Sequence, residues 1–257
     1  MAASIRAAVV NMMHYSKSSH IGSCLSIVDI LYVLYFHYLV IDPSSPRMPE
    51  RDRFILSKAH GSAALYAVLA KRGFFSEKLL DTYCIDGGRL PGHLDRAAVP
   101  GVEASAGSLG HGLPIAVGMA LAAKMRGERH RIVCLLGDGE CNEGSVWEAV
   151  MFATANALSN LTLIVDHNML QGLGRNVLKQ DELSGRFRAF GCEAYDIDGH
   201  QHDEIFSVLN VPQKAVKAVV AHTVKGKGVS FMEDRLEWHY KSPNDAEKDA
   251  ALKELGA

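Results

Sequence analysis

The sequence lacks any strong excess of charge of one sign. Lys and Arg together number 27, and Asp and Glu together number 29, so the formal net charge is −2 at pH 7. The two signs are interspersed along the chain, and no basic stripe of the kind that follows a nucleic-acid backbone is present. We therefore expect no nucleic-acid partner.

Segments that would direct the chain to a membrane are also absent by sequence criteria. The opening stretch MAASIRAAVV carries a single Arg, and Asn11 and His14 soon interrupt its apolar character. Such a pattern does not build a signal sequence, and we judge no later apolar run long enough to span a membrane. The expected location is cytoplasmic, without membrane contact.

The cysteines show no CxxC spacing. They are odd in number and scattered, at Cys24, Cys84, Cys134, Cys141 and Cys192. This distribution argues against a disulfide framework and against a zinc site. Free, buried thiols are the expectation.

Short apolar runs alternate with amphipathic patterns along the 257 residues. Helical periodicity fits residues 3–15, 24–40, 61–73, 113–126, 144–158, 202–210 and 244–255. Strands are predicted at 53–57, 131–136, 161–166, 193–197 and 215–223. Because the strands are apolar on both faces, the fold class is α/β, with a mostly parallel sheet covered by helices on both faces. We expect one domain over residues 1–257.

Two polar segments follow adjacent predicted strands. They read GDGECNEG at 137–144 and DHNMLQG at 166–172. In parallel sheets, ligands gather at the carboxyl ends of the strands. Asp138 and Asn168 offer hard oxygen ligands suited to Mg²⁺, which commonly completes its coordination shell with phosphate oxygens and water.

Glycines flank the carboxylate in the first of these segments. Gly137 and Gly139 would let a diphosphate approach the backbone, and the helix expected to begin near Glu143 adds its N-terminal dipole. A metal-bound diphosphate is one reading of this pattern. The alternative is a plain strand-to-helix turn with a capping Asn after the next strand.

The GDG sequence, followed after about thirty residues by an Asn at a strand end, resembles the thiamin diphosphate fingerprint. Further segments resemble the transketolase family: SSHIGSCLSIVDILYVLY (18–35), DRFILSKAHGSAALYAVL (52–69), GRLPGHLD (88–95), SAGSLGHGLPIAVGMALAAK (105–124) and VKGKGVSFMED (224–234). Because they keep one order over nearly the whole chain, they are far more specific than any single motif. The resemblance implies the thiamin-diphosphate-binding fold.

This resemblance covers only the amino-terminal, diphosphate-binding half of a transketolase. A full-length member carries a second domain, which binds the aminopyrimidine ring and supplies the activating glutamate. The chain is therefore identified as the N-terminal subunit of a split transketolase, with a separate C-terminal, pyrimidine-binding partner chain in what we expect to be a heterotetramer. A truncated form of a longer chain is the alternative.

By resemblance, the cofactors are thiamin diphosphate and Mg²⁺, for which Ca²⁺ or Mn²⁺ could substitute. The implied metal ligands are the side chains of Asp138 and Asn168 and the backbone carbonyl of Leu170. Gly139 would donate its N–H to the diphosphate. The expected cofactor-binding residues are His60, Gly110, Gly112, Gly137, Gly139, Asn168 and His239.

Four histidines are the expected catalytic residues, together with Glu143: three lie inside the family-like segments, and His239, after Trp238, follows the last of them. The resemblance places His60 and His239 near the diphosphate and the thiazolium ring, and His20 and His93 near the donor sugar. With an unperturbed pKa near 6.5, imidazole can take or give a hydroxyl proton at neutral pH. Glu143 would reach toward the partner's activating carboxylate, although a helix-start acid favoured by the dipole explains it too.

Five further positions are ambiguous or depart from the family pattern. Lys225 and Lys227 could approach the diphosphate, or could lie on a solvated turn. His111 stands where Gln is common, and Tyr240 stands where Gly is usual after the histidine. His167 replaces a commoner Asp or Asn, and strand alternation suggests that it points away from the metal.

The implied reaction is transfer of a two-carbon ketol unit from a ketose, expected to be phosphorylated, to an aldose. Other enzyme readings are a deoxyxylulose-phosphate synthase and a 2-oxoacid dehydrogenase component, against which the four histidines argue. A non-catalytic module that binds a diphosphate or a partner is the reading from a different class. The apolar segments 113–123 and 145–158 could supply the subunit interface or the chain's own core.

Overall fold

The computed structural model describes residues 1–175, 178 and 180–257. The helices are α1 (Ala2–Ser16), α2 (Ile21–Leu25), α3 (Val28–Val33), a π-helical turn (Leu34–Tyr38), α4 (Ser62–Arg72), α5 (Gly112–Met125), α6 (Gly144–Ala155), α7 (Leu183–Ala189), α8 (His202–Asn210) and α9 (Asp245–Leu255). Short 3₁₀ turns cover Ala59–Gly61, Glu77–Thr82, Gly139–Asn142 and Leu236–His239. The strands are β1 (Arg53–Leu56), β2 (Ile132–Gly137), β3 (Leu161–His167), β4 (Leu170–Gln171), β5 (Gly174–Arg175), β6 (Glu193–Asp198) and β7 (Lys217–His222).

The main sheet has five strands in the order β1-β2-β3-β7-β6, and every neighbouring pair is parallel. This arrangement confirms the predicted parallel α/β fold. The register places Gly137 of β2 opposite Asp166 of β3. The two polar segments singled out in the sequence therefore leave the sheet side by side.

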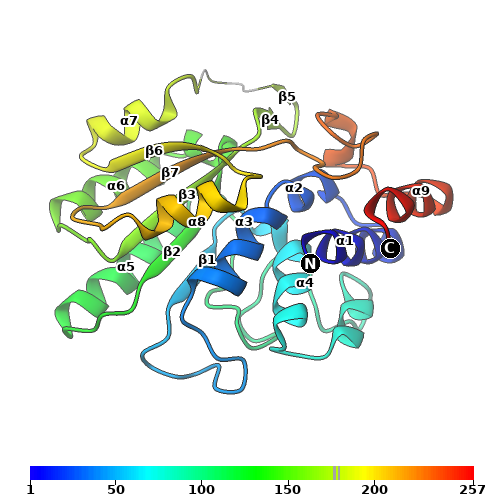
Figure 1. Ribbon diagram of the computed structural model, residues 1–257, viewed down its shortest axis with the longest axis horizontal. Helices are drawn as coiled ribbons and strands as arrows, with labels where there is room; N and C mark the ends of the chain where they lie inside the picture. The colour runs from blue at the N-terminus through cyan, green and yellow to red at the C-terminus, as the bar shows by residue number, and fades with distance from the viewer. Residues whose placement is uncertain (176–177, 179) are drawn as a thin grey trace.

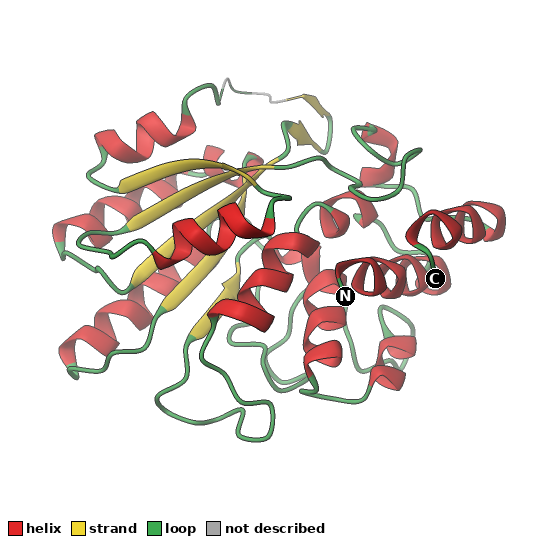
Figure 2. Ribbon diagram, in the orientation of Figure 1, coloured by secondary structure: helices red, strands yellow, loops and turns green. Residues whose placement is uncertain are grey.

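Helices cover both faces of this sheet (Figures 1 and 2). Along β2, Val133 and Leu135 pack into the core shared with α1–α4 and α8, while Ile132, Cys134 and Leu136 pack into the core shared with α5, α6 and α7. The alternation explains why the strand reads as continuously apolar. Helix α9 packs on α1 beyond the sheet.

The predicted single helix over 24–40 is wrong. The chain forms α2, breaks near Ser26 and Ile27, continues as α3 and ends in the π-helical turn. At the break, the carbonyl of Ser23 accepts hydrogen bonds from the hydroxyl of Ser26 and from the ammonium of Lys58. The apolar pattern continues across the break, so periodicity alone does not reveal it.

Two small features were not predicted from the sequence. Helix α7 has seven residues, and β4 and β5 form a two-stranded antiparallel ladder directly after β3. Elements this short carry too little periodicity to be recognised. All five cysteines are free as expected, but Cys84 is exposed rather than buried.

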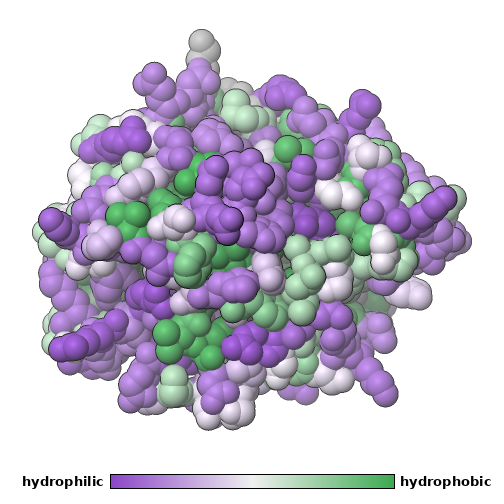
Figure 3. Space-filling model, in the orientation of Figure 1, coloured by the Kyte–Doolittle hydropathy of each residue, from purple (hydrophilic) through white to green (hydrophobic). Residues whose placement is uncertain are grey.

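One segment does reach membrane-spanning length, contrary to the sequence-based expectation. The stretch Ile21–Tyr38 has 18 residues and a mean hydropathy of 1.4, and 83% of it is buried inside the protein. This stretch comprises α2, α3 and the π-helical turn. The face of the molecule shown in Figure 3 is largely hydrophilic, with small separate groups of hydrophobic residues.

Candidate active site

Four adjacent parallel strands deliver polar side chains to one edge of the sheet. Lys58 follows β1, Asp138 follows β2, Asn168 follows β3 and Lys225 follows β7. All four line a cavity of about 250 Å³, together with His60, Gly137, Gly139, Leu170 and His239. The carboxyl edge of the sheet therefore holds the cavity, as expected for a parallel α/β fold.

Asp138 begins the 3₁₀ turn after β2 and is almost fully buried. One carboxylate oxygen accepts from the N–H of Gly139 at 2.7 Å, and the other accepts from the N–H of Met169 at 2.7 Å. The second bond ties the turn after β2 to the turn after β3. Burial, and then the nearby charge of Asp166, raise the pKa of Asp138.

Asn168 and Leu170 bring two more oxygens to this place. The side-chain oxygen of Asn168 accepts from the N–H of Leu170 at 3.1 Å, and its amide nitrogen donates to Asp166 at 3.0 Å. The carbonyl of Leu170 accepts from the ammonium of Lys225 at 3.0 Å. The three predicted metal ligands thus line one cavity.

The donor set fits a hard divalent cation. It comprises a carboxylate, an amide oxygen and a backbone carbonyl, which are oxygen ligands of the kind Mg²⁺ and Ca²⁺ take. A buried carboxylate with a raised pKa is stabilised as an anion when a cation binds beside it. Within the described part of the chain, no cluster of three or more His, Cys, Asp or Glu side chains could hold a metal ion. The remaining ligands would therefore have to come from water or from phosphate oxygens.

The glycines near the cavity have different surroundings. Gly137 and Gly139 line the cavity. The N–H of Gly110, whose φ is +77°, donates to the buried carboxylate of Glu140 at 2.8 Å. A β-carbon on Gly112 would lie 2.5–2.6 Å from atoms of Ser57, so close packing explains that glycine. Gly110 and Gly112 are not among the lining residues, and their cofactor-binding role stays a prediction.

The four predicted histidines come together beside this cavity. The ring of His20 lies 5.3 Å from that of His60, 6.2 Å from that of His93 and 4.9 Å from that of His239. These residues come from four segments of the chain, which only the fold brings together. His20 has a φ of +81°, a backbone conformation that non-glycine residues rarely adopt and that is often found at functional sites.

Hydrogen bonds fix the orientation of this cluster. The N–H of His20 donates to the carbonyl of His239 at 2.7 Å, and Ser19 lies 3.0 Å from Nδ1 of His20. The ammonium of Lys225 lies 2.8 Å from Nδ1 of His239. Because an ammonium can only donate, Nδ1 accepts and the ring proton of His239 resides on Nε2.

Three histidines of the cluster have pKa values below the ordinary value for imidazole. Burial, and then neighbouring cationic groups, lower the pKa of His20 to about 4 and that of His239 to about 3. Burial and Lys58 place the pKa of His60 well below its usual range. These three rings are therefore neutral at pH 7 and act as hydrogen-bond donors and acceptors. Lys225 has its own pKa lowered to about 8, by burial first and then by Lys58.

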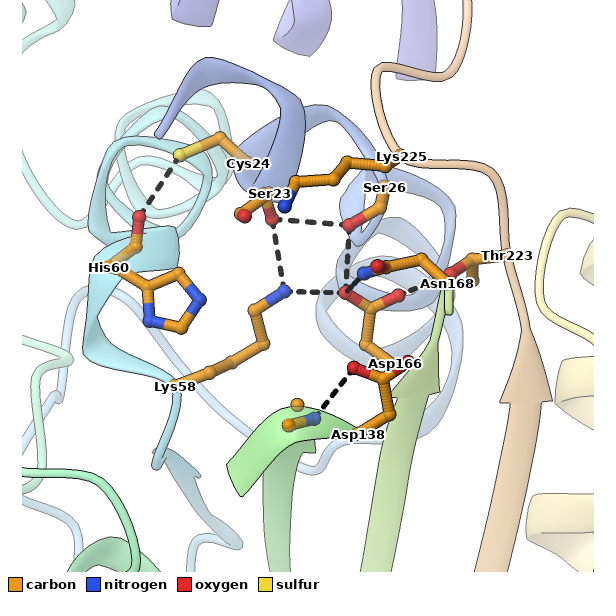
Figure 4. A network of polar contacts seen from close by, with 12 residues as sticks. Ser23, Cys24, Ser26, Lys58, His60, Asp138, Asp166, Asn168, Thr223 and Lys225 are labelled. Carbon is orange, nitrogen blue, oxygen red and sulfur yellow. Dashed lines mark hydrogen bonds and ion pairs between the residues drawn. The ribbon is translucent and has the colours of Figure 1, made fainter. Parts of the chain in front are cut away.

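A buried ion pair between Lys58, which lines the cavity, and Asp166 was not predicted from the sequence (Figure 4). Lys58 contacts Asp166 at 2.5 Å, with side chains 1% and 0% exposed. Asp166 also accepts from Ser26 at 2.8 Å and from the hydroxyl of Thr223. Burial alone would raise the pKa of Asp166, but Lys58 and these hydrogen bonds hold it below its usual value. The lysine within SKAH, one residue after a strand, was the available signal.

Two other predicted positions lie at the surface or beside the cavity. Glu143 is exposed at the start of α6 and makes no side-chain capping bond, although its β-carbon packs against Gly110. His111 is exposed at the start of α5, and its Nδ1 lies 3.1 Å from the carbonyl of Leu109. Neither side chain lines the cavity.

The ambiguous lysines and His167 have distinct environments. Lys225 is buried in the cavity, so the solvated-turn reading is wrong for it. Lys227 is half-buried and pairs with Glu233 at 3.5 Å. His167 is buried, its ring lies 5.1 Å from that of His222, and it is not among the lining residues. It lies close enough to Asp138 for the two charges to interact, so its pointing away from the metal stays a prediction.

Comparison with known proteins gives a consistent assignment. Residues 1–257 match the family model described as transketolase, thiamine diphosphate binding domain. An apulose-4-phosphate transketolase subunit of Actinobacillus succinogenes is 43% identical, and the match covers 97% of this chain and 92% of that protein. A 6-deoxy-6-sulfo-D-fructose transketolase subunit of a Clostridium species is 42% identical, with 92% and 88% covered.

Longer relatives match over part of their length only. Human transketolase is 39% identical, and the match covers 87% of this chain but 36% of the human protein. The crystal structure of transketolase from Campylobacter jejuni superimposes with a TM-score of 0.92 at 30% identity, covering 99% of this chain and 42% of that one. The chain thus spans well under half the length of these transketolases and about nine-tenths of the two subunit relatives.

Proposed function

Because this chain belongs to the transketolase family, we propose that it is the N-terminal, diphosphate-binding subunit of a two-chain transketolase. The observation that carries the proposal is the cavity itself, where the predicted metal ligands and two of the four histidines meet at one sheet edge and the other two histidines adjoin. The two subunit relatives, of nearly the same length as this chain, support a split enzyme.

Thiamin diphosphate, when bound, supplies the electron sink that allows a carbon–carbon bond next to a carbonyl to break and re-form. In the proposed site, Asp138, Asn168 and the carbonyl of Leu170 hold the divalent cation that accompanies the diphosphate. The buried ammonium of Lys225, which already donates to this carbonyl, would add a positive charge to a site for an anionic diphosphate. Anchoring of the cofactor is thus assigned to the turns after β2, β3 and β7.

The histidines have the task of orienting sugar hydroxyls and carrying their protons. His20 and His239 are neutral and partly accessible, so they can donate to or accept from a hydroxyl without first losing a proton. Their low pKa values arise in part from Lys225 and Lys58. An anionic diphosphate would offset that positive field and make both imidazoles better bases.

The pyrimidine half of the site is assigned to a partner chain. Helices α5 and α6 bury one side in the chain's own core and leave apolar side chains on the surface, among them Ile115, Met151 and Phe152, which are 38%, 48% and 48% exposed. Glu143 lies exposed at the start of α6. These features support a subunit interface on this side and a hetero-oligomer, which we propose to be a heterotetramer.

The proposal predicts metal-dependent cofactor binding. Isothermal titration of thiamin diphosphate into the chain mixed with its C-terminal partner chain should give binding with Mg²⁺ present, and much weaker binding after chelation. Asp138→Ala should abolish the metal dependence, whereas Asp203→Ala, at an exposed position of α8, should leave it unchanged. Equal affinity for the Asp138→Ala variant and the wild-type protein would contradict the metal assignment.

A further inference from the structure

Tyr240 is a large aromatic residue that the core does not need. It follows the 3₁₀ turn Leu236–His239 and is 60% exposed, whereas Trp238, two residues earlier, is 1% exposed and anchors the turn through a bond to the carbonyl of Phe231. The ring of Tyr240 lies 4.6 Å from that of His239 and 6.5 Å from that of His20. An exposed aromatic at this position borders the histidine cluster rather than the interior.

Gly172 lies next to the hydroxyl of this tyrosine. It lies in the turn between β4 and β5 and lines the cavity, two residues after the proposed metal ligand Leu170. A β-carbon on Gly172 would lie 2.8 Å from the hydroxyl of Tyr240 and 3.2 Å from Nε2 of His239. Gly172 is not one of the glycines with positive φ, so its backbone conformation does not require a glycine, and a β-carbon here would first meet the tyrosine hydroxyl.

The position of Tyr240 relative to the cavity defines what it can contact. The proposed metal ligands lie deep, at the strand ends, and the histidine cluster lies beside them. Tyr240 is the exposed residue next to His239. Tyr240 is not itself among the lining residues, but its ring lies 4.6 Å from that of His239, which lines the cavity, so a ligand that reaches outward past His239 would meet the phenol ring. Sugar C–H faces pack well on aromatic rings, and the phenol hydroxyl can bond to a sugar hydroxyl.

We propose that Tyr240 is a specificity-determining residue of the ketol-transfer site, which packs against donor carbons beyond C3, and that Gly172 is glycine because the tyrosine hydroxyl fills the adjoining space. The inference rests on the proposed function. The two residues form an adjacent pair next to the histidine cluster.

The test compares donors of different length with the reconstituted two-chain enzyme. One donor is hydroxypyruvate, whose carbon chain ends at C3, and the other is a seven-carbon ketose phosphate. Relative to wild type, Tyr240→Ala should lower the ratio of kcat/KM for the long donor to that for the short donor by about three- to tenfold, mainly through KM. Tyr15→Ala is the matched control, because Tyr15 is 65% exposed with its ring 5.4 Å from a neighbouring histidine, in α1.

Gly172→Ala tests the proposed fit between Gly172 and the hydroxyl of Tyr240. The added methyl group would push the tyrosine hydroxyl aside, so the donor ratio should fall as in Tyr240→Ala. Removing the hydroxyl in the double variant Gly172→Ala/Tyr240→Phe should restore the ratio to that of Tyr240→Phe alone. A loss that the double variant does not reverse would overturn the pairing.

The outcomes separate this inference from the proposed function. A wild-type mixture with no ketol transfer would overturn both. An active wild-type enzyme whose donor ratio changes less than twofold in Tyr240→Ala would overturn the specificity role alone. A reduced ratio in Tyr240→Ala with an unchanged ratio in Tyr15→Ala would support it.

Discussion

Replacing Lys58 with Met should destabilise the protein strongly at neutral pH. The ammonium is 1% exposed and pairs with Asp166, which is 0% exposed, so the substitution leaves a buried carboxylate without its cation. Breaking a buried ion pair in this way costs about 3–5 kcal/mol in the free energy of unfolding. At roughly 2–4 °C per kcal/mol for a chain of this size, Tm should fall by roughly 6–20 °C.

The loss of stability in the Lys58→Met variant should depend on pH. In the wild-type protein the pKa of Asp166 is lowered, so its contribution to stability is present above the unfolded value of 3.8 and is lost as pH falls. Without Lys58, burial dominates and raises that pKa. The difference in stability between variant and wild type should therefore be largest near pH 7 and shrink toward pH 4.

Urea unfolding followed by tryptophan fluorescence at several pH values measures the loss in the free energy of unfolding and its dependence on pH. Lys71→Met is the matched control, because Lys71 pairs with Glu77 at the surface, with side chains 22% and 55% exposed. It should cost less than about 1 kcal/mol. If Lys58→Met cost no more than Lys71→Met, or if its cost did not change with pH, the account of the buried pair would be refuted.

Three further outcomes are expected. Gly112→Ala should lower Tm measurably, because the new methyl group would lie 2.5–2.6 Å from Ser57, whereas Gly144→Ala, with open space around it, should change Tm much less. The free energy of unfolding should fall between pH 6.5 and pH 4 as the unfolded chain takes up protons that His20 and His239 do not accept when folded, with pKa values of about 4 and 3. Each ring changes the free energy of unfolding by at most about 1.4 kcal/mol per pH unit, and by less because both rings are partly exposed. His20→Asn should therefore reduce the dependence of the free energy of unfolding on pH. Lys225→Met should weaken binding of thiamin diphosphate at least tenfold by calorimetry, and an unchanged affinity would remove this lysine from the diphosphate site.

Much of the sheet could be predicted from the sequence, because β1, β2, β3 and β7 each contain an uninterrupted apolar run, whereas β6 reads EAYDID and is only half-buried. The five strands lie within about two residues of their predicted bounds. The helix over 24–40 could not be predicted correctly, since its break depends on a lysine that is distant in the sequence. At the break, Lys58 donates a hydrogen bond to the carbonyl of Ser23. A tertiary contact thus overrides a local pattern.

The site shows the same division between local and distant information. Asp138 and Asn168 could be found because each directly follows a strand and carries a metal-binding oxygen. The buried pair of Lys58 and Asp166 could not be predicted. A lysine and an aspartate near strand ends are usually exposed, and the sequence alone does not show that these two are buried together. Likewise, the fit between Tyr240 and Gly172 joins residues 68 positions apart and is visible only in three dimensions.

The central claim is that this chain forms half of a transketolase site. The most direct measurement is ketol transfer from a ketose phosphate to an aldose, with thiamin diphosphate and Mg²⁺, assayed for this chain by itself, for its C-terminal partner chain by itself and for the mixture. The account predicts turnover in the mixture only. Turnover by this chain without its partner, or none in a mixture that forms a stable complex by light scattering, would contradict it.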